Sequence, residues 1–189
     1  MVMADEVSKT KTLETQHIVS VLVENRSGTL SRVSGLFSRR GYNIDSLTVG
    51  ETEDVSISRM TIAVTGRNSV LEQIVKQLEK LVDVIAVREL DPSSCIKREI
   101  MLVKISADEA KRSTVIQVAN IFRSRVIDVS PTTITIEASG DLKKLDGLIL
   151  LLQPYGILEL VRTGLVALER GPAVLSVPPF MSNREGEKE

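Results

Sequence analysis

The segment formed by residues 17–50 has the sequence HIVSVLVENRSGTLSRVSGLFSRRGYNIDSLTVG, in which two apolar runs flank an amphipathic stretch. Residues 18–23 are rich in β-branched side chains and predict a buried strand. From Leu30 onward the apolar residues follow the spacing of one helical face, and Gly41 can take the left-handed conformation that ends a helix. Residues 44–49 predict a second strand, so the whole segment predicts a strand, a turn, a helix and a strand.

The chain after this segment completes a pattern of six elements. A polar turn at residues 51–54 precedes a third strand at residues 55–65. A helix that begins within residues 66–69 carries apolar residues along one side as far as Leu81, and residues 82–90 predict a fourth strand. The order β-α-β-β-α-β is the split βαβ arrangement, an antiparallel sheet with both helices on one face. Alternation in the third strand predicts two faces, one with Ser58, Met60, Ile62 and Val64, the other with Arg59, Thr61 and Ala63.

The second half of the chain repeats this plan. Residues 61–66 (TIAVTG) are similar to residues 135–140 (TIEASG), and the apolar residues of the helices that follow keep the same offset. The pattern predicts strands at residues 98–106, 126–129, 132–138 and 157–168, and helices at residues 108–123 and 142–152. The sequence therefore predicts an α+β fold class with two ferredoxin-like βαββαβ domains in tandem.

Composition indicates where these domains begin and end. Proline and serine in residues 91–97 disfavour a continuing strand and predict a linker. Both ends of the chain are polar or contain proline, which predicts flexible segments. The expected division is a flexible N-terminal extension at residues 1–16, a first domain at residues 17–90, the linker, a second domain at residues 98–170 and a flexible tail at residues 171–189.

Composition and charge exclude several classes of function. With 24 Lys and Arg against 25 Asp and Glu, the formal net charge is -1, so no overall positive field attracts nucleic acid or an anionic membrane. Two Tyr, three Phe and no Trp are few for a protein that stacks bases on aromatic rings. A single cysteine, Cys95, and the lack of a signal-like or membrane-spanning apolar run predict a soluble cytoplasmic protein.

The sequence contains no recognisable catalytic or metal site. His17 is the single histidine and Cys95 the single cysteine, so neither a zinc ligand set nor a Ser-His-Asp or Cys-His arrangement can be assembled. A Gly-rich phosphate loop is also absent. We therefore expect no catalytic residue, no metal ligand and no cofactor in this chain.

The turn at residues 25–28 (NRSG) is the candidate for a binding site. It lies between a buried strand and a helix start, where unpaired backbone N–H groups and the positive end of the helix dipole favour an anion. Gly28 lets a ligand carboxylate approach the backbone without a Cβ in the way. The alternative interpretation is a plain strand–helix turn, with Ser27 or Thr29 as the helix cap.

The residues around this turn suit a neutral α-amino acid. Asn25 and Asn43 each offer an amide oxygen to an ammonium group and an NH2 to a carboxylate. Leu30 and Ile44 are apolar and can contact an aliphatic side chain. These residue types therefore predict a ligand that carries both charges and a hydrocarbon side chain.

Longer motifs now indicate a family. The segment at residues 17–50, followed by ISRMTIAVTG, LEQIVKQLEKLVDVIAV and REIMLVKI, resembles the regulatory small subunit of acetohydroxyacid synthase, also called acetolactate synthase. The resemblance covers residues 16–170. It implies that the first half is an ACT domain, an amino-acid-sensing βαββαβ module, and that the second half is the smaller C-terminal ferredoxin-like domain of this family.

The resemblance implies a non-catalytic subunit of branched-chain amino acid biosynthesis that activates a separate catalytic large subunit. It also implies allosteric feedback inhibition by a branched-chain amino acid, with valine expected before isoleucine or leucine. The effector would lie between the ACT domains of a homodimer, against Asn25, Gly28, Leu30, Asn43 and Ile44. Thiamine diphosphate, Mg2+ and FAD would belong to the catalytic partner.

Two other classes of function stay open on the sequence. The chain could be a free-standing amino-acid sensor that acts on another enzyme or on a transcription factor. It could also be a structural assembly subunit that stabilises the synthase and binds no effector. An autonomous enzyme fits least, because no catalytic set can be assembled.

Overall fold

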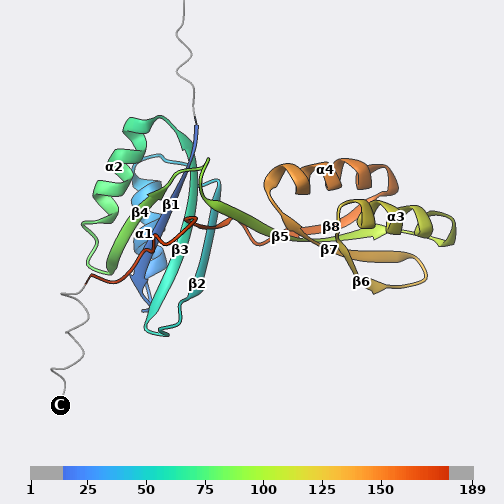
Figure 1. Ribbon diagram of the computed structural model, residues 1–189, viewed down its shortest axis with the longest axis horizontal. Coiled ribbons are helices and arrows are strands. Elements are labelled where there is room, and N and C mark those ends of the chain that lie inside the picture. The colour runs from blue at the N-terminus through green and yellow to red at the C-terminus, as the bar shows by residue number, and fades with distance from the viewer. Residues whose placement is uncertain (1–14, 179–189) are drawn as a thin grey trace, which may run out of the picture.

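The computed structural model describes residues 15–178, which form two βαββαβ units placed side by side (Figure 1). The first unit contains β1 (Thr15–Glu24), α1 (Thr29–Arg39), β2 (Ser46–Glu51), β3 (Ile57–Gly66), α2 (Asn68–Leu78) and β4 (Val84–Leu90). The second contains β5 (Ile96–Ser106), α3 (Glu109–Ile121), β6 (Arg125–Val129), β7 (Thr133–Gly140), α4 (Leu142–Leu152), the 3-10 turn η1 (Gln153–Tyr155), β8 (Ile157–Arg162) and the additional strand β9 (Val166–Leu168). The predicted α+β class with two ferredoxin-like units is confirmed.

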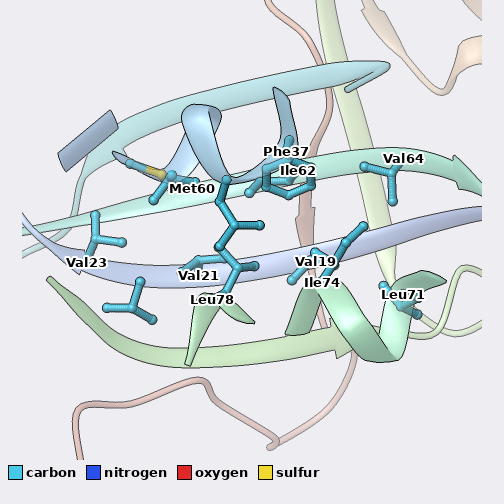
Figure 2. Close-up of a cluster of buried hydrophobic side chains, with 13 residues drawn as sticks. Val19, Val21, Val23, Phe37, Met60, Ile62, Val64, Leu71, Ile74 and Leu78 are labelled. Carbon is cyan, nitrogen blue, oxygen red and sulfur yellow. The ribbon is translucent and has the colours of Figure 1, made fainter. Parts of the chain in front are cut away.

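The first unit is a four-stranded antiparallel sheet in the order β2-β3-β1-β4, with α1 and α2 on one face. Alternate residues of the central strand β1 point toward the helices and are almost fully buried. They pack with residues of β3, α1 and α2 in one cluster (Figure 2), whose labelled members are Val19, Val21, Val23, Phe37, Met60, Ile62, Val64, Leu71, Ile74 and Leu78. Burial of each such side chain stabilises the fold by roughly 1.5–3 kcal/mol. The core also accounts for the helical and strand periodicities of the sequence, because the apolar residues of each element face it.

The second unit has the same plan, with the strand order β6-β7-β5-β8. Its core lies between this sheet and the helices α3 and α4, and Met101, Val103 and Ile105 of β5 occupy its centre. The predicted helix at residues 142–152 is confirmed as α4. Both units therefore bury one face of a central strand beneath two helices.

The other face of the first sheet is also buried, which the sequence did not predict. Ile18 of β1 and Ala63 of β3 contact Leu165 and Ala167 from the end of the chain, in a cluster that also contains Leu90 and Cys95. Figure 1 shows the C-terminal segment crossing this sheet. This cover explains why β1 is buried on both faces and reads as a continuous apolar run.

The predicted final strand at residues 157–168 is interrupted, so that prediction was wrong. β8 and β9 both pair with β5, with Arg162 opposite Met101 and Val166 opposite Arg98. Three residues, 163–165, therefore lie opposite two residues of β5, so this strand carries the one extra residue of a β-bulge. Gly164 has φ +87°, which bends the strand from the second sheet onto the first.

The described residues include part of each end that was predicted to be flexible. Thr15 and Gln16, predicted in the N-terminal extension, belong to β1, while residues 1–14 lie outside the described residues. Residues 171–178 of the predicted tail have no helix or strand, and they lie across the first sheet, where Leu175 and Val177 line a groove. Residues 179–189 lie outside the described range.

Candidate functional site

The turn between β1 and α1 is held open by contacts to the β2–β3 hairpin. The backbone N–H of Asn25 donates to the carbonyl oxygen of Ser56 at 2.7 Å. The side-chain NH2 of Asn25 donates to the carbonyl oxygen of Val55 at 2.9 Å and to Oε1 of Glu51 at 3.1 Å. Since this NH2 is used within the chain, the amide oxygen is the part of Asn25 that can serve a ligand, as an acceptor for an ammonium group.

Gly28 itself occupies the N-cap position of α1, with φ +86° and ψ -12°. No side chain caps this helix, so the predicted capping role of Ser27 or Thr29 was wrong: Thr29 is the first helical residue and is buried. The φ value explains why glycine stands here, because side chains other than Asn and Asp are strained in this conformation. The start of α1 thus presents backbone N–H groups beside a position without a Cβ.

Arg32 is a residue of this site that the sequence did not indicate. Its guanidinium donates to both carboxylate oxygens of Asp83, from Nε to Oδ2 at 2.5 Å and from Nη2 to Oδ1 at 2.8 Å. Nη1 lies 3.0 Å from the place where a Cβ on Gly28 would stand. The only local signal was the four-residue spacing of Arg32 from Gly28 on one helix, because Asp83 is 51 residues away in the sequence.

This ion pair is neutral overall, and it fixes the guanidinium so that Nη1 lies beside the open helix start. The hydrogen bond to Asp83 raises the pKa of Arg32, and the hydrogen bond from Arg32 lowers the pKa of Asp83. Both groups therefore stay charged near neutral pH. A fixed guanidinium beside Gly28 favours an anionic group at the turn, in addition to the helix dipole.

Asn43 and Ile44 lie at the opposite end of α1 from the turn. They follow Gly41 and precede β2, and Asn43 donates from Nδ2 to Oδ1 of Asp45 at 3.2 Å. An 11-residue helix is about 16 Å long, so this pair cannot reach a small ligand at Gly28 of the same chain. One chain brings together Asn25, Gly28 and the half-exposed Leu30 but not the other two predicted residues.

A groove lies on the face of the first sheet that is away from the helices. It has a volume of about 650 Å³ and separates the covered face of the first sheet from residues 171–177. Arg59 and Arg88 line it, and none of the five predicted site residues does. Nη1 of Arg88 is paired with Oε2 of Glu169 at 2.7 Å, so the groove belongs to the contact between the sheet and the C-terminal segment.

Other chemistry finds no support within residues 15–178. No group of three or more His, Cys, Asp or Glu side chains in this range is arranged to hold a metal ion. Among the helices of the same range, none combines the length and the apolar character that a membrane crossing needs. The start of α1 keeps backbone N–H groups that no side chain caps, and such groups can bind an anion.

The fold and this turn define the class of protein, an ACT domain followed by a second ferredoxin-like unit. Residues 19–86 match the family described as AHAS small subunit-like ACT domain, and residues 98–171 match the family described as small subunit of acetolactate synthase. The chain belongs to the family of acetolactate synthase small subunits.

Curated relatives and a solved structure agree with this assignment. The chain is 54% identical over 156 residues to the probable acetolactate synthase small subunit of Methanothermobacter thermautotrophicus, with 82% of this chain and 93% of that protein covered. It is 51% identical over 161 residues to the isozyme 3 small subunit of Salmonella typhimurium, with 85% and 99% covered. The crystal structure of the small subunit from Thermotoga maritima matches with 42% identity and a TM-score of 0.79, with 84% of this chain and 99% of that chain covered.

Membership in this family establishes the general function of the chain. The chain is a regulatory small subunit of acetolactate synthase, an enzyme of branched-chain amino acid biosynthesis, and its partner is the catalytic large subunit. The resemblance seen in the sequence is confirmed.

Proposed function

We propose that this subunit activates the catalytic large subunit and confers feedback inhibition by a branched-chain amino acid, valine before leucine or isoleucine. The observation that carries the proposal is the uncapped start of α1 at Gly28, with Arg32 fixed beside it. A zwitterionic ligand can place its carboxylate there and its ammonium group at the amide oxygen of Asn25. Thiamine diphosphate, Mg2+ and FAD are assigned to the catalytic partner.

The complete effector site is proposed to need two chains. Asn25, Gly28 and Leu30 lie at one end of α1, and Asn43 and Ile44 lie at the other. A two-fold axis that pairs two antiparallel copies of α1 or β2 would bring the first end of one chain to the second end of its partner. Within residues 15–178, β3 is the only strand that pairs with β2, so the outer backbone edge of β2 is available for such pairing.

The regulatory step is proposed to be a shift between two arrangements of this homodimer. An effector that bridges two chains favours the arrangement that holds them together around it, and that arrangement supports the active catalytic subunit less well. A coupling free energy of roughly 1–3 kcal/mol is enough, because it changes affinity about 5–150-fold.

Replacement of Gly28 by Asp tests the site in the reconstituted synthase. Asp tolerates the backbone conformation at φ +86° but places a carboxylate where the effector carboxylate should lie. We expect activation to be retained and the valine concentration for half-inhibition to rise by about tenfold or more, which is about 1.4 kcal/mol. Gly28→Asn is the matched control, since it has the same shape and backbone strain without the charge, and should retain more sensitivity than Gly28→Asp.

A G28D synthase with wild-type valine sensitivity would refute the site. If calorimetry of the wild-type chain with valine, leucine and isoleucine gives three flat titrations, the structural assembly role is correct instead. Affinity capture addresses the free-standing sensor, because the proposal requires a thiamine-dependent synthase as the main partner.

A mixture of two variants tests whether the site is shared. Homodimers of Gly28→Asp and homodimers of Asn43→Ala should each lack a complete site. A heterodimer of the two keeps one intact site, formed by Gly28 of the second chain and Asn43 of the first, and should bind the effector at half the wild-type stoichiometry. A site contained in one chain would stay defective in every combination, so absence of binding by the heterodimer excludes the two-chain site.

A further inference from the structure

The bulge between β8 and β9 rests directly on the first residues of β2. The backbone N–H of Leu165 donates to Oγ of Ser46 at 2.7 Å. Oγ1 of Thr48 donates to the carbonyl oxygen of Thr163 at 3.4 Å. The connection between the second sheet and the C-terminal segment thus contacts the edge strand of the ACT domain on its non-helical face.

Gly164 makes this contact close. A Cβ at this position would lie 2.8 Å from Oγ of Ser46 and 2.9 Å from Oγ1 of Thr48, nearer than side chains approach. The φ of +87° also disfavours any other residue. The backbone of the bulge therefore packs against the two hydroxyl groups with no room for a side chain between them.

The bulge is anchored on both sides. Leu165 and Ala167 are 3% and 5% exposed, in the cluster with residues of β1, β3 and β4. In the other direction, Thr163 stays paired with Ile100 of β5, since its N–H donates to the Ile100 carbonyl oxygen at 3.0 Å and its Oγ1 accepts from the Ile100 N–H at 3.1 Å. β5 continues from there into the second sheet, so the bulge joins the two units through packed and hydrogen-bonded backbone (Figure 1).

Ser46 is also next to the proposed effector loop. Asn43 and Ile44 precede it by three and two residues. Asp45 lies between Ile44 and Ser46. Its Oδ1 accepts from Nδ2 of Asn43 at 3.2 Å, and its Oδ2 accepts from Oγ1 of Thr65 at 2.7 Å. Ile44, Asp45 and Ser46 are consecutive, so the backbone connects Ile44 directly to the residue whose hydroxyl holds the bulge.

We propose that the contact of Ser46 with the Gly164 bulge transmits effector occupancy from the ACT domain to the second unit. The inference rests on the proposed function, because it needs an effector at Asn43 and Ile44. It adds the regulation of that site: the bulge is the two-state element, docked on Ser46 in one state and released or shifted in the other.

Hydrogen–deuterium exchange of the full chain, without ligand and with saturating valine, leucine or isoleucine, tests both ideas separately. In the wild-type chain we expect the effector to slow exchange at residues 25–30 and 43–46, which reports the site. We also expect the exchange rate at residues 163–168 to change by about fivefold or more, the lower end of common coupling factors, which reports the transmission.

Two variants and one control sharpen the test. Ser46→Ala removes the acceptor for Leu165, and Gly164→Ala places a methyl group against Ser46 and Thr48; each should keep the effect at residues 25–30 and lose the effect at residues 163–168. Gly171→Ala is the matched control, since Gly171 has φ +77° but no atom near its missing Cβ, and it should keep both effects.

Each outcome of this experiment supports or overturns the proposed transmission. Protection at the ACT residues with no change at residues 163–168 in the wild-type chain overturns the transmission and leaves the effector site in place. Both effects intact in S46A and G164A also overturn it. No response anywhere to any of the three amino acids overturns the proposed function, and the transmission with it.

Discussion

The two βαββαβ units begin their first helices in opposite ways. In the ACT domain, Gly28 stands at the N-cap of α1 and no side chain caps the helix. In the second unit, Asp108 stands at the N-cap of α3, and its Oδ1 accepts from the backbone N–H of Lys111 at 3.0 Å. Asp141 caps α4 in the same way, through the N–H of Lys144 at 2.9 Å.

Under the proposed function, this difference gives a physical reason why the first unit would bind an effector and the second would not. A carboxylate at the N-cap satisfies a free N–H and the helix dipole within the chain, which leaves no place for the carboxylate of a ligand. The start of α1 lacks this internal carboxylate. The second unit keeps the framework but has closed the position that the ACT domain leaves open.

The two sheets differ on their outer faces as well. On the first sheet Ile18 and Leu90 are covered by the C-terminal segment, whereas Ile100 and Val161 on the corresponding face of the second sheet are 45% and 57% exposed. The C-terminal segment therefore packs on the sheet of the ACT domain, and the sheet of the second unit has no such cover on these residues. The contrast predicts that the two units respond differently to the same kind of substitution.

The largest effect should come from cavities in the two cores. Ile74 and Leu148 are both fully buried, one in each unit, and replacement of either by Ala should lower the free energy of unfolding by about 2–5 kcal/mol. Urea unfolding followed by circular dichroism measures this. Calorimetry with valine should show weakened binding for Ile74→Ala and unchanged affinity for Leu148→Ala; loss of binding in L148A would mean that sensing needs an intact second unit.

The cores were predictable from the sequence because their periodicity is local. The apolar spacing of residues 142–152 defines α4. The alternation of β3 placed Met60, Ile62 and Val64 on one face, and the structure shows all three in the core beneath the helices. The cover of the opposite face was not predictable. Ser20 and Thr61 are polar but buried, and the residues that contact Ala63 on this face, Leu165 and Ala167, come from the far end of the chain.

The site was predictable only in part, because some of its contacts join residues that are far apart in the sequence. Gly28 at a strand–helix turn is a local signal, but its left-handed conformation was not predicted. The left-handed conformation predicted for Gly41 is confirmed by its φ of +69°. The ion pair of Arg32 spans 51 residues, and the contact of Leu165 with Ser46 spans 119, so no window of sequence contains either. The involvement of Asn43 and Ile44 in the effector site stays a prediction that needs a second chain.

A smaller effect should separate the two kinds of helix start. Replacement of Asp108 by Ala removes the cap of α3 and should reduce the free energy of unfolding by about 1 kcal/mol. The matched substitution in the first unit is Ser27→Ala, next to the N-cap of α1, and it should change stability by less than about 0.5 kcal/mol, because Ser27 caps nothing. Urea midpoints of the two variants measure this; equal losses would mean that Ser27 supports α1 after all, and the contrast between the helices would fail.

The smallest effect concerns how the open start of α1 is held, and it depends on pH. The hydrogen bond from Arg32 lowers the pKa of Asp83 below the ordinary value of about 3.9. The carboxylate of Asp83 then binds a proton more readily in the unfolded chain than in the folded one. The stability that the Arg32–Asp83 pair contributes is therefore present above the ordinary pKa and is lost as the pH falls through the lowered pKa. The stability difference between wild type and Asp83→Asn should be constant near neutral pH and shrink in acid.

Urea unfolding of the two proteins over a series of pH values measures this difference. Asp83 also accepts from the backbone N–H of Glu24, at 2.9 Å, through its own carbonyl oxygen, a contact that Asn would keep. A difference that shrinks in acid therefore assigns the effect to the carboxylate and Arg32. A difference that persists unchanged in acid would trace it to altered packing at residue 83, and the guanidinium beside Gly28 would then not be held by charge.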